Sequence, residues 1–370
     1  MSDFHGIIYA YGKTPELGEL VKSRIAASLP FCSRYRLIDF SLSSMANAGI
    51  HNVGVIMQRD YQSLLDHIGS GKDWDMDRRI GGLRMLPPFG LPEYHTGNYT
   101  GTIEALNAVS TYVRGIREKY IVMMHGNLAA NLDLTDIIEN HKKSGADITA
   151  ICTDITPEYK HHRYLVDADG FSRGMVFNQT ESGQGKASLE AYVISKELLV
   201  TMMDACAAAN HHHFHLDAIA AYLAAGGKIN IYMHKGYARR IMSVESYFKT
   251  SMDMLKKENR AELFPAERPV RSKSVEAVST YYGEGAVSRN SLVADGCIIN
   301  GELDNCIVFS DCRIEKGAKL SNCIIMRGGV AGEGVNLSSV IADKYCGIEA
   351  FQTLAGSAKL PIVIPKNSKI

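Results

Sequence analysis

The first residues that could take part in chemistry lie in a loop after the apolar run Gly6–Ala10. A buried strand that opens into a loop is a common phosphate-binding place in an α/β sheet, because backbone N–H groups there can point at an anion. This loop holds Gly12, but it also holds Tyr11, Pro15 and Glu16. Proline has no N–H to donate, and glutamate repels a phosphate. The loop therefore has the position of a phosphate cradle without its usual chemistry.

A second polar group follows another apolar run, since Tyr120–Met124 leads into His125-Gly126-Asn127. Ligands of doubly wound sheets bind at the carboxyl ends of the strands. The loops after Ala10 and after Met124 are therefore the two places where we expect a site.

Arg34, Tyr35, Arg36 and Asp39 form a basic and aromatic cluster just before an apolar segment. Two interpretations remain open. Arg34 and Arg36 could bind a phosphate or another anionic effector, since arginine recognises such groups well. Alternatively, the cluster is a capped helix start with a surface salt bridge.

A run of histidines, His211-His212-His213-Phe214-His215, invites a metal-binding interpretation. Consecutive histidines on a loop rarely converge on one ion, whereas the i, i+4 pair His211 and His215 could do so on a helix. We expect a loop and turn without a metal here, and the same for His161 and His162. The only tryptophan, Trp74, is expected to be a packing anchor.

These residues must be positioned by regular elements, and the first two thirds of the chain alternates short apolar runs with longer amphipathic segments. We expect strands at Gly6–Ala10, Val53–Met57, Tyr120–Met124, Asp147–Ile151 and Ala191–Ile194. We expect helices at Leu37–Ala48, Gln62–Ile68, Thr102–Ile116, Leu134–Ser144 and Lys196–Ala209. This alternation predicts the α/β class, with a doubly wound, Rossmann-like sheet covered by helices on both faces.

The residue pattern changes after the linker FPAERPVRSKS, which contains two prolines and four charged residues. Beyond it, single aliphatic residues recur about every six positions: Val308, Ile314, Leu320, Ile324, Val330, Val335 and Ile341. This spacing indicates the hexapeptide repeats of a parallel β-helix, although a β-sandwich of short strands is the alternative. We predict a first domain at residues 1–265, a linker at 266–275 and a left-handed parallel β-helix at 276–370.

The composition is that of an ordinary globular protein, with 370 residues, 46% hydrophobic and 22% charged. Forty basic residues balance forty acidic ones, which argues against a nucleic-acid partner. No apolar run approaches the roughly 20 residues that a membrane span needs, and no secretory leader is evident. We expect a cytoplasmic protein that binds no membrane, whose eight cysteines form no disulfides.

Four stretches resemble the glucose-1-phosphate adenylyltransferases, the ADP-glucose pyrophosphorylases of bacterial glycogen synthesis. They are RYRLIDFSLSSMANAGI at 34–50, HIGSGKDWDMDRRIGGLRMLPP at 67–88, GTIEAL at 101–106 and SVESYFKTSMDML at 243–255. The resemblance implies a first domain that joins ATP to glucose 1-phosphate and releases pyrophosphate. It also implies a β-helix that contributes to oligomerisation and to the response to effectors.

The resemblance further implies a glycine-rich phosphate loop, and here the chain departs from the family. An ungapped alignment keeps Gly12 but places Tyr11 on a glycine, Pro15 on a threonine and Glu16 on an arginine. Ala26 stands where a downstream lysine belongs. The loop has thus lost flexible residues, an N–H donor and two cations.

The departures continue at the residues that the family uses for the sugar phosphate and for Mg²⁺. Gln179 replaces the sugar-phosphate lysine, while Asn127 and Arg240 replace the two aspartates that hold the metal. An amide lacks the charge that Mg²⁺ prefers, and a guanidinium repels the ion. Gly101 and Thr102 match the segment that contacts the base. They could be a remnant of the nucleotide site, or a helix start at which Thr102 caps and Glu104 favours the dipole.

Together these departures resemble the catalytically impaired GlgD-type subunits of the family, which pair with an active subunit and raise its activity. The resemblance implies no catalytic residues, no metal and no cofactor in this chain, with Mg²⁺ held by the active partner. It implies a homo- or hetero-oligomer with the catalytic subunit. Two alternatives stay open: a free-standing sensor of a sugar phosphate or nucleotide, and an active pyrophosphorylase with a rearranged site that recruits Lys22, Arg24, Asp133 and Asp154.

Overall fold

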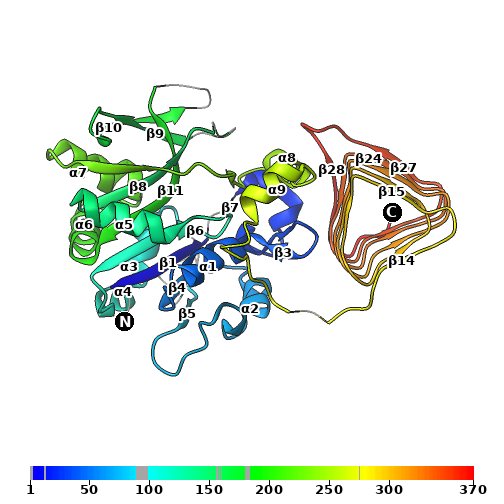
Figure 1. The fold of residues 1–370 in the computed structure, drawn as a ribbon, viewed down its shortest axis with the longest axis horizontal. Helices are drawn as coiled ribbons and strands as arrows, with labels where there is room; N and C mark the ends of the chain where they lie inside the picture. The colour runs from blue at the N-terminus through cyan, green and yellow to red at the C-terminus, as the bar shows by residue number, and fades with distance from the viewer. Residues whose placement is uncertain are drawn as a thin grey trace.

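The computed structural model describes residues 3–11, 14–88, 99–155, 157, 159, 161–179, 184–274 and 276–370, without the side chains of 178 and 179. Figure 1 shows two parts: a layered α/β domain that carries the N-terminus and a triangular prism of short strands that carries the C-terminus. The predicted Gln179 has no described side chain, and Gly12 lies outside the described residues. The molecule therefore has the two-domain organisation that the change in the spacing of apolar residues indicates.

Nine of the described strands form one sheet in the order β5-β4-β1-β6-β11-β8-β12-β10-β9. They are β1 (Phe4–Ala10), β4 (Val53–Met57), β5 (Leu83–Leu86), β6 (Tyr120–His125), β8 (Ile148–Thr153), β9 (His161–Val166), β10 (Phe171–Gln179), β11 (Lys186–Ser195) and β12 (Ile229–Met233). All five predicted strands are present. The pairs β5–β4, β4–β1, β1–β6 and β8–β12 are parallel, but β11 runs antiparallel between β6 and β8, which an apolar pattern cannot reveal.

Helices cover both faces of this sheet (Figure 1). The described helices are α1 (Leu37–Asn47), α2 (Gln62–Ile68), α3 (Thr102–Ala108), α4 (Ser110–Gly115), α5 (Leu134–Ser144), α6 (Lys196–Ala208), α7 (Ala220–Ala224), α8 (Val244–Asp253) and α9 (Lys257–Leu263), of which α8 and α9 lie between the sheet and the β-helix. The single helix predicted over Thr102–Ile116 is wrong, because Val109 has φ −112° and ψ 25°, outside the helical region, and separates α3 from α4.

Strand alternation gives the sheet one hydrophobic core on each face. Ile8 on β1 faces the core shared with α1 and α5, while its neighbour Ile7 faces the core shared with α3 and α6. Successive side chains of a strand point to opposite faces, so two adjacent isoleucines serve two separate cores. Trp74 is fully buried in the first of these cores, which confirms its packing role.

The second domain is a left-handed parallel β-helix whose three five-stranded sheets form the sides of the prism in Figure 1. One sheet holds β14 (Tyr281–Tyr282), β17 (Ile298–Ile299), β20 (Arg313–Ile314), β23 (Val330–Ala331) and β26 (Gly347–Ile348). The next holds β15 (Val287–Arg289), β18 (Glu302–Asp304), β21 (Lys319–Ser321), β24 (Asn336–Ser338) and β27 (Thr353–Ala355). The last holds β16 (Leu292–Val293), β19 (Ile307–Val308), β22 (Ile324–Ile325), β25 (Val340–Ala342) and β28 (Ile362–Ile364).

Aliphatic side chains stack from one coil of the β-helix to the next. Leu303, Leu320 and Leu337 are in register on successive coils and are buried. The predicted inward position of Val330 is wrong: its side chain faces solvent, and the adjacent Ala331 is buried instead. A one-residue shift of the pattern reverses which face a side chain takes, and irregular corners introduce such shifts.

The two domains meet at a third hydrophobic core. The outward-facing Ile307, Ile324 and Ile341 of the last β-helix sheet join a cluster that also contains Tyr247 and Phe248 of α8. Between α9 and β14 the described chain forms no helix or strand. The β-helix is therefore fixed to the first domain by packed side chains as well as by the linker.

A buried ion pair adds to this interface. The Arg24 guanidinium binds the Asp343 carboxylate of the β-helix, and both side chains are almost completely buried. The Arg24 Nε also donates to the Leu20 carbonyl at 3.0 Å. A charge pair taken out of water in this way must keep both partners.

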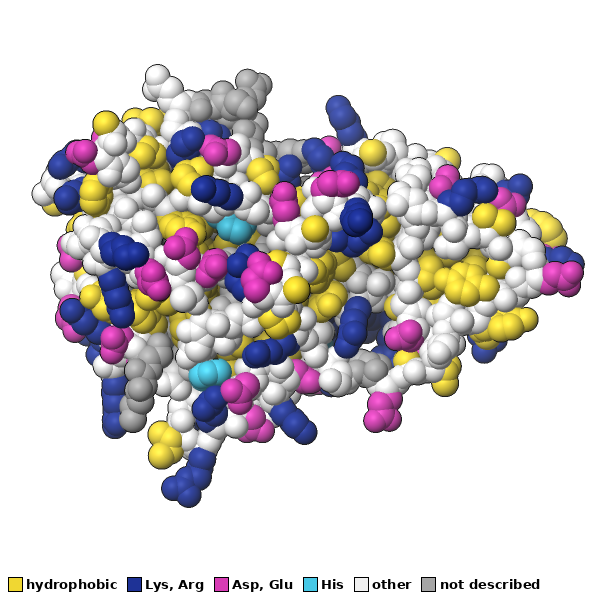
Figure 2. Space-filling view, viewed as in Figure 1, with side chains coloured by type: hydrophobic (Ala, Val, Ile, Leu, Met, Phe, Trp, Pro, Cys, Tyr) yellow, Lys and Arg dark blue, Asp and Glu magenta, His cyan; other side chains and the backbone are white. Residues whose placement is uncertain are grey.

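Charges of both signs are interspersed over the face shown in Figure 2, consistent with the neutral net charge. All eight cysteines are buried and none forms a disulfide, as the sequence predicts. None of the described helices combines the length and the apolar character that crossing a bilayer would require.

The Arg24–Asp343 pair yields a stability prediction. Arg24→Ala should lower the free energy of unfolding by about 3–5 kcal/mol, because it leaves Asp343 buried and unpaired. The double variant Arg24→Met/Asp343→Leu should recover most of that loss. Urea denaturation measures both, and Lys22→Ala serves as the control because Lys22 is exposed and two residues away. An Arg24→Ala protein as stable as the control would contradict the role given to the pair.

Candidate functional site

The residue after β1 closes the space that a phosphate cradle would offer. The Tyr11 ring packs edge-on against Tyr9 at 5.6 Å and against Tyr99 at 5.4 Å between ring centroids. Burial raises the pKa of Tyr11 above its ordinary value, and its ring lies beside Thr102 and Arg240. A side chain of this size replaces the open backbone that glycine would leave for a ligand.

The other altered loop positions have structural roles. Pro15 and Glu16 are exposed and start the 3-10 helix η1 (Pro15–Val21), where a proline at N1 and an acid in the first turn are both favourable. Ala26 lies in the short helix η2 (Ala26–Ser28) and is buried at the interface between the domains. The segment is thus organised for packing rather than for holding an anion.

The side chains of Arg240, Glu190, His125 and Asn127 form one connected polar network in the first domain. Arg240 lies on β13 (Ala238–Arg240), which pairs with β7 (Leu128–Ala130) beside Asn127. Its Nη1 lies 2.6 Å from Glu190 Oε2, its Nη2 lies 3.3 Å from His125 Nδ1, and its Nε donates to Asn127 Oδ1 at 3.4 Å. His125 Nε2 completes the network at 3.2 Å from the same Glu190 oxygen.

The Asn127 amide forms a second hydrogen bond through its nitrogen, since Nδ2 donates to the Ile241 carbonyl at 2.7 Å. The two positions at which the resemblance implies metal-binding aspartates therefore carry a fully engaged amide and a guanidinium. Mg²⁺ prefers several hard, charged oxygen ligands. The residues present do not fit this ion.

The electrostatics of the network are consistent with one internal charge pair. Burial would raise the pKa of Glu190, but the Arg240 charge and the His125 hydrogen bond hold that pKa well below its ordinary value. Burial, followed by the Arg240 charge, lowers the pKa of His125 to about 4. His125 is then neutral at pH 7: its Nε2–H donates to Glu190, and its Nδ1 accepts from Arg240.

Glu190 adopts an unusual backbone conformation. Its φ is +52°, and the pairing of β11 with β8 shifts register between Ser188 and Ala191. A non-glycine residue in the left-handed region costs roughly 1 kcal/mol, and such strain gathers at functional sites. The bulge therefore turns the Glu190 carboxylate toward Arg240 at an energetic cost.

The predicted base-contacting segment is covered by another loop. The His212 carbonyl accepts from the backbone N–H groups of Ile103 at 2.9 Å and Glu104 at 3.3 Å, which satisfies the start of α3. A Cβ on Gly101 would lie 2.2 Å from this carbonyl oxygen, so only glycine fits. The expectation that Thr102 caps the helix is wrong, because Gly101 is the N-cap and Thr102 is the first helical residue.

Arg34 and Arg36 lie in a different place, at a cavity of about 500 Å³ between the domains. Arg34 precedes β3 (Tyr35–Arg36) and Arg36 ends it, in a hairpin with β2 (Pro30–Phe31). Lys273, Arg327 and Lys344 line the same cavity. Arg34 is exposed, and its side chain has no partner among the described residues. Arg36 donates to the carbonyl and hydroxyl oxygens of Ser63, and burial lowers its pKa to about 10.

The start of α1 agrees with the helix-cap interpretation of this cluster, and the effector interpretation stays a prediction. Asp39 does accept from the Arg36 N–H at 2.9 Å at the start of α1. Its partner is the buried His67, at 2.5 Å, rather than an arginine on the surface. Burial, followed by the Arg36 and Arg24 charges, lowers the pKa of Lys344 to about 7. The cavity is therefore lined by several basic side chains that repel one another, and Asp66 and Asp295 also belong to its lining.

The charges that a rearranged active site could recruit are not brought together. Lys22 pairs with Glu19 on the surface and Arg24 with Asp343 in the domain interface. Asp133 pairs with Arg268, and Asp154 pairs with Lys186. Each of these four side chains forms an ion pair with a residue outside this set.

Sequence reasoning missed Glu190 and His125 as members of the site. The only signal for Glu190 was an acid within the apolar strand sequence SLEAYVIS, which indicates an internal partner without naming it. His211 is exposed and takes no part in the network, whereas His215 lies in the π-helix η4 (Phe214–Ile219) close to Glu190 and His162.

The neutral, buried His125 predicts that stability depends on pH. Because its folded pKa is lowered from 6.5 to about 4, this stability is fully present above pH 6.5 and is lost as the pH falls toward 4. We expect a loss of about 2 kcal/mol between pH 7 and pH 5 from this group. His125→Gln should reduce that dependence, whereas His211→Gln should not. Urea denaturation at the two pH values measures it, and equal slopes in all three proteins would contradict the assignment.

Comparison with known proteins matches each of the two domains to a family model. The model of the nucleotidyl transferase family matches residues 5–257, and the model of the GlmU-like C-terminal hexapeptide matches residues 274–357. The glycogen biosynthesis protein GlgD of Bacillus subtilis (strain 168) is 31% identical over 350 residues, which cover 95% of this chain and 92% of that protein.

Two glucose-1-phosphate adenylyltransferases are nearly as similar. The enzyme of Clostridium perfringens (strain SM101 / Type A) is 29% identical over 325 residues, covering 86% of this chain and 83% of that one. The enzyme of Clostridium botulinum (strain Alaska E43 / Type E3) is 30% identical over 326 residues with the same coverages. The chain thus belongs to the nucleotidyl transferase family, within the group that contains GlgD and the glucose-1-phosphate adenylyltransferases.

Proposed function

We propose that this chain acts in glycogen biosynthesis as a regulatory subunit of a glucose-1-phosphate adenylyltransferase and has little or no activity alone. The observation that carries the proposal is the largely buried Arg240–Glu190 ion pair, whose side chains are 11% and 15% exposed. It lies where the family resemblance implies the second metal carboxylate. The guanidinium supplies a positive charge at that point, but it is bound to the protein's own carboxylate and not to a substrate.

The reaction of the adenylyltransferases explains why this matters. A sugar phosphate must approach the α-phosphate of ATP, and pyrophosphate must leave, so two anions have to be neutralised and aligned. Tyr11, Asn127 and Arg240 stand at positions that serve this purpose in the resemblance, and none of them supplies the negatively charged oxygen that Mg²⁺ prefers. Each lost preorganised contact of this kind costs on the order of 3 kcal/mol in the transition state, although such losses do not add.

The partner in this proposal is the catalytic subunit, which holds the Mg²⁺. The intact fold supports a role in assembly, because the sheet, both helical layers and the complete β-helix are retained while the site residues differ.

The basic cavity between the domains supports a regulatory function. An anionic effector that binds there would contact Arg34 and Arg36 of the first domain and Lys344 of the β-helix at once. Such a ligand favours one relative arrangement of the domains, and so it can change the activity of an attached subunit.

Activity measurements test the main proposal. The purified chain with Mg²⁺, ATP and glucose 1-phosphate should form negligible ADP-glucose, whereas mixing it with an active subunit should raise the kcat or lower the KM of that subunit. Turnover by this chain alone near the usual enzyme median of roughly 10 s⁻¹ would overturn it.

Exchange of labelled pyrophosphate into nucleoside triphosphate, measured with each of a panel of nucleotide sugars, separates the alternatives. Exchange with any of them would favour a rearranged active site. No exchange, together with no effect on an active subunit, would favour a free-standing sensor.

Thermal shift measurements test the cavity. At least one of ATP, ADP-glucose, glucose 1-phosphate and fructose bisphosphate should raise the melting temperature, since a ligand at 100 times its Kd stabilises the native state by about 2.7 kcal/mol. Arg34→Ala should reduce the shift strongly. Arg313→Ala, an exposed arginine on β20 outside the cavity, should leave it unchanged. A shift that survives Arg34→Ala in full would place the ligand elsewhere.

A further inference from the structure

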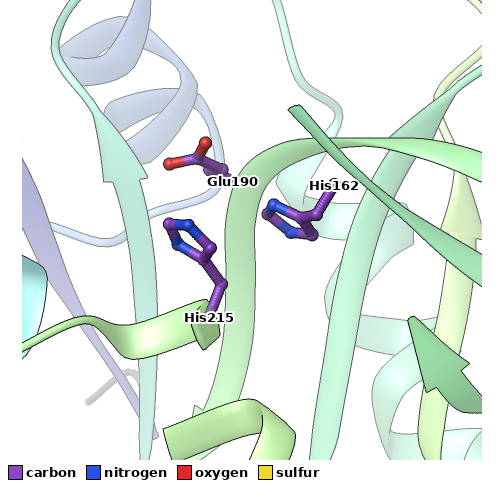
Figure 3. A group of neighbouring side chains, drawn as sticks. All are labelled: His162, Glu190 and His215. Atoms are coloured by element: carbon purple, nitrogen blue, oxygen red, sulfur yellow. The ribbon is translucent and has the colours of Figure 1, made fainter. Parts of the chain in front are cut away.

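Three side chains, one of them Glu190 of the polar network, lie close together outside the positions that the resemblance assigns to a metal. His162 comes from β9, Glu190 from β11 and His215 from η4, and one ligand atom of each lies within 4.8 Å of the others. Figure 3 shows the two rings side by side with the carboxylate beyond them. Among the residues that the structure describes, this is the one such group of histidine, cysteine and acidic side chains.

We propose that His162, Glu190 and His215 bind a zinc-class transition metal ion. Two imidazoles and one carboxylate are a ligand set that zinc uses when it keeps a fourth position open. Nitrogen ligands suit Zn²⁺, Co²⁺ and Ni²⁺, whereas Mg²⁺ prefers oxygen. The site therefore differs in chemistry and in residues from the Mg²⁺ site that the family resemblance implies, and it does not depend on the proposed function.

The donor atoms have the freedom that ligands need. Arg240 and His125 both contact Glu190 through Oε2, and its Oε1 has no partner among the described residues. His162 Nε2 lies 3.0 Å from the Tyr192 hydroxyl. When Nε2–H donates to this hydroxyl, the Nδ1 lone pair stays available, which is the usual outer-shell support of a metal-binding histidine.

His215 is the most available of the three ligands. Its ring nitrogens have no hydrogen-bond partner within the described part of the chain, although its ring stacks on His162 at 4.8 Å and 9° between planes. Parallel rings do not aim their lone pairs at one point, so His215 must turn about its Cβ–Cγ bond to join the site. That torsion is broad and the turn is inexpensive.

The backbone at two of the ligands is unusual in a way that suits a site. Glu190 is left-handed with φ +52°, and His215 lies in a π-helix. Both features cost energy and are frequent at functional positions. Burial holds the pKa of both histidines below its ordinary value, so both are neutral at pH 7, as metal binding requires.

Cobalt titration of the full chain, after removal of metals with a chelator, tests the proposal. We expect one equivalent of Co²⁺ with the intense visible bands of a four- or five-coordinate ion. His215→Ala should weaken binding more than about 100-fold, and Tyr192→Phe should weaken it about 10-fold by removing outer-shell support. His211→Ala is the matched control, because His211 is an exposed histidine of the same run.

The outcomes are decisive in each direction. Absence of stoichiometric binding by the native chain overturns the proposal, and so does native-like binding by His215→Ala. Loss of binding in His211→Ala assigns the metal to the surface histidine run instead. Circular dichroism of each variant shows that it is folded, and His215→Ala removes a side chain that makes no hydrogen bond, so its fold should be unaffected.

Discussion

The buried ion pair between Arg240 and Glu190 determines the geometry of the whole candidate site. Each charge loses several kcal/mol of hydration when it is buried, and the pair repays that cost only if the remaining donors and acceptors are also satisfied. His125 and Asn127 provide those hydrogen bonds. Because the four side chains come from β13, β11, β6 and the loop after it, one electrostatic requirement fixes these four segments relative to one another.

The segment to which the family resemblance assigns phosphate binding forms part of the contact between the two domains. Leu17, Leu20 and Ala26, in the two short helices after β1, lie in the same hydrophobic cluster as Ile324 and Ile341 of the β-helix. Arg24, between those helices, holds Asp343 across the interface. A loop that must open for a nucleotide cannot also be a packed domain contact, so its new rigidity and its lost chemistry have one cause.

Much of this could be predicted from the sequence. The five core strands and the β-helix follow from apolar periodicity and from the hexapeptide spacing. The antiparallel insertion of β11 could not be predicted, since periodicity reports burial but not strand direction. Nor could the partner of Arg240: Glu190 lies 50 residues away and reaches it only through a bulge with left-handed backbone. The hydrogen bonds from the start of α3 to the His212 carbonyl could not be predicted either, because every residue type has a backbone carbonyl.

The pairing also constrains how such a site can change. An arginine placed at position 240 without Glu190 would be a buried, unpaired cation, which costs about 3–5 kcal/mol. Conversely, an aspartate restored at position 240 would face Glu190 across a distance now spanned by a 2.6 Å contact, and the two carboxylates would repel each other. Either single change is therefore unfavourable, while the exchange of both is not. The charge pair therefore couples positions 190 and 240, so that either residue can change without loss of stability only when the other changes with it.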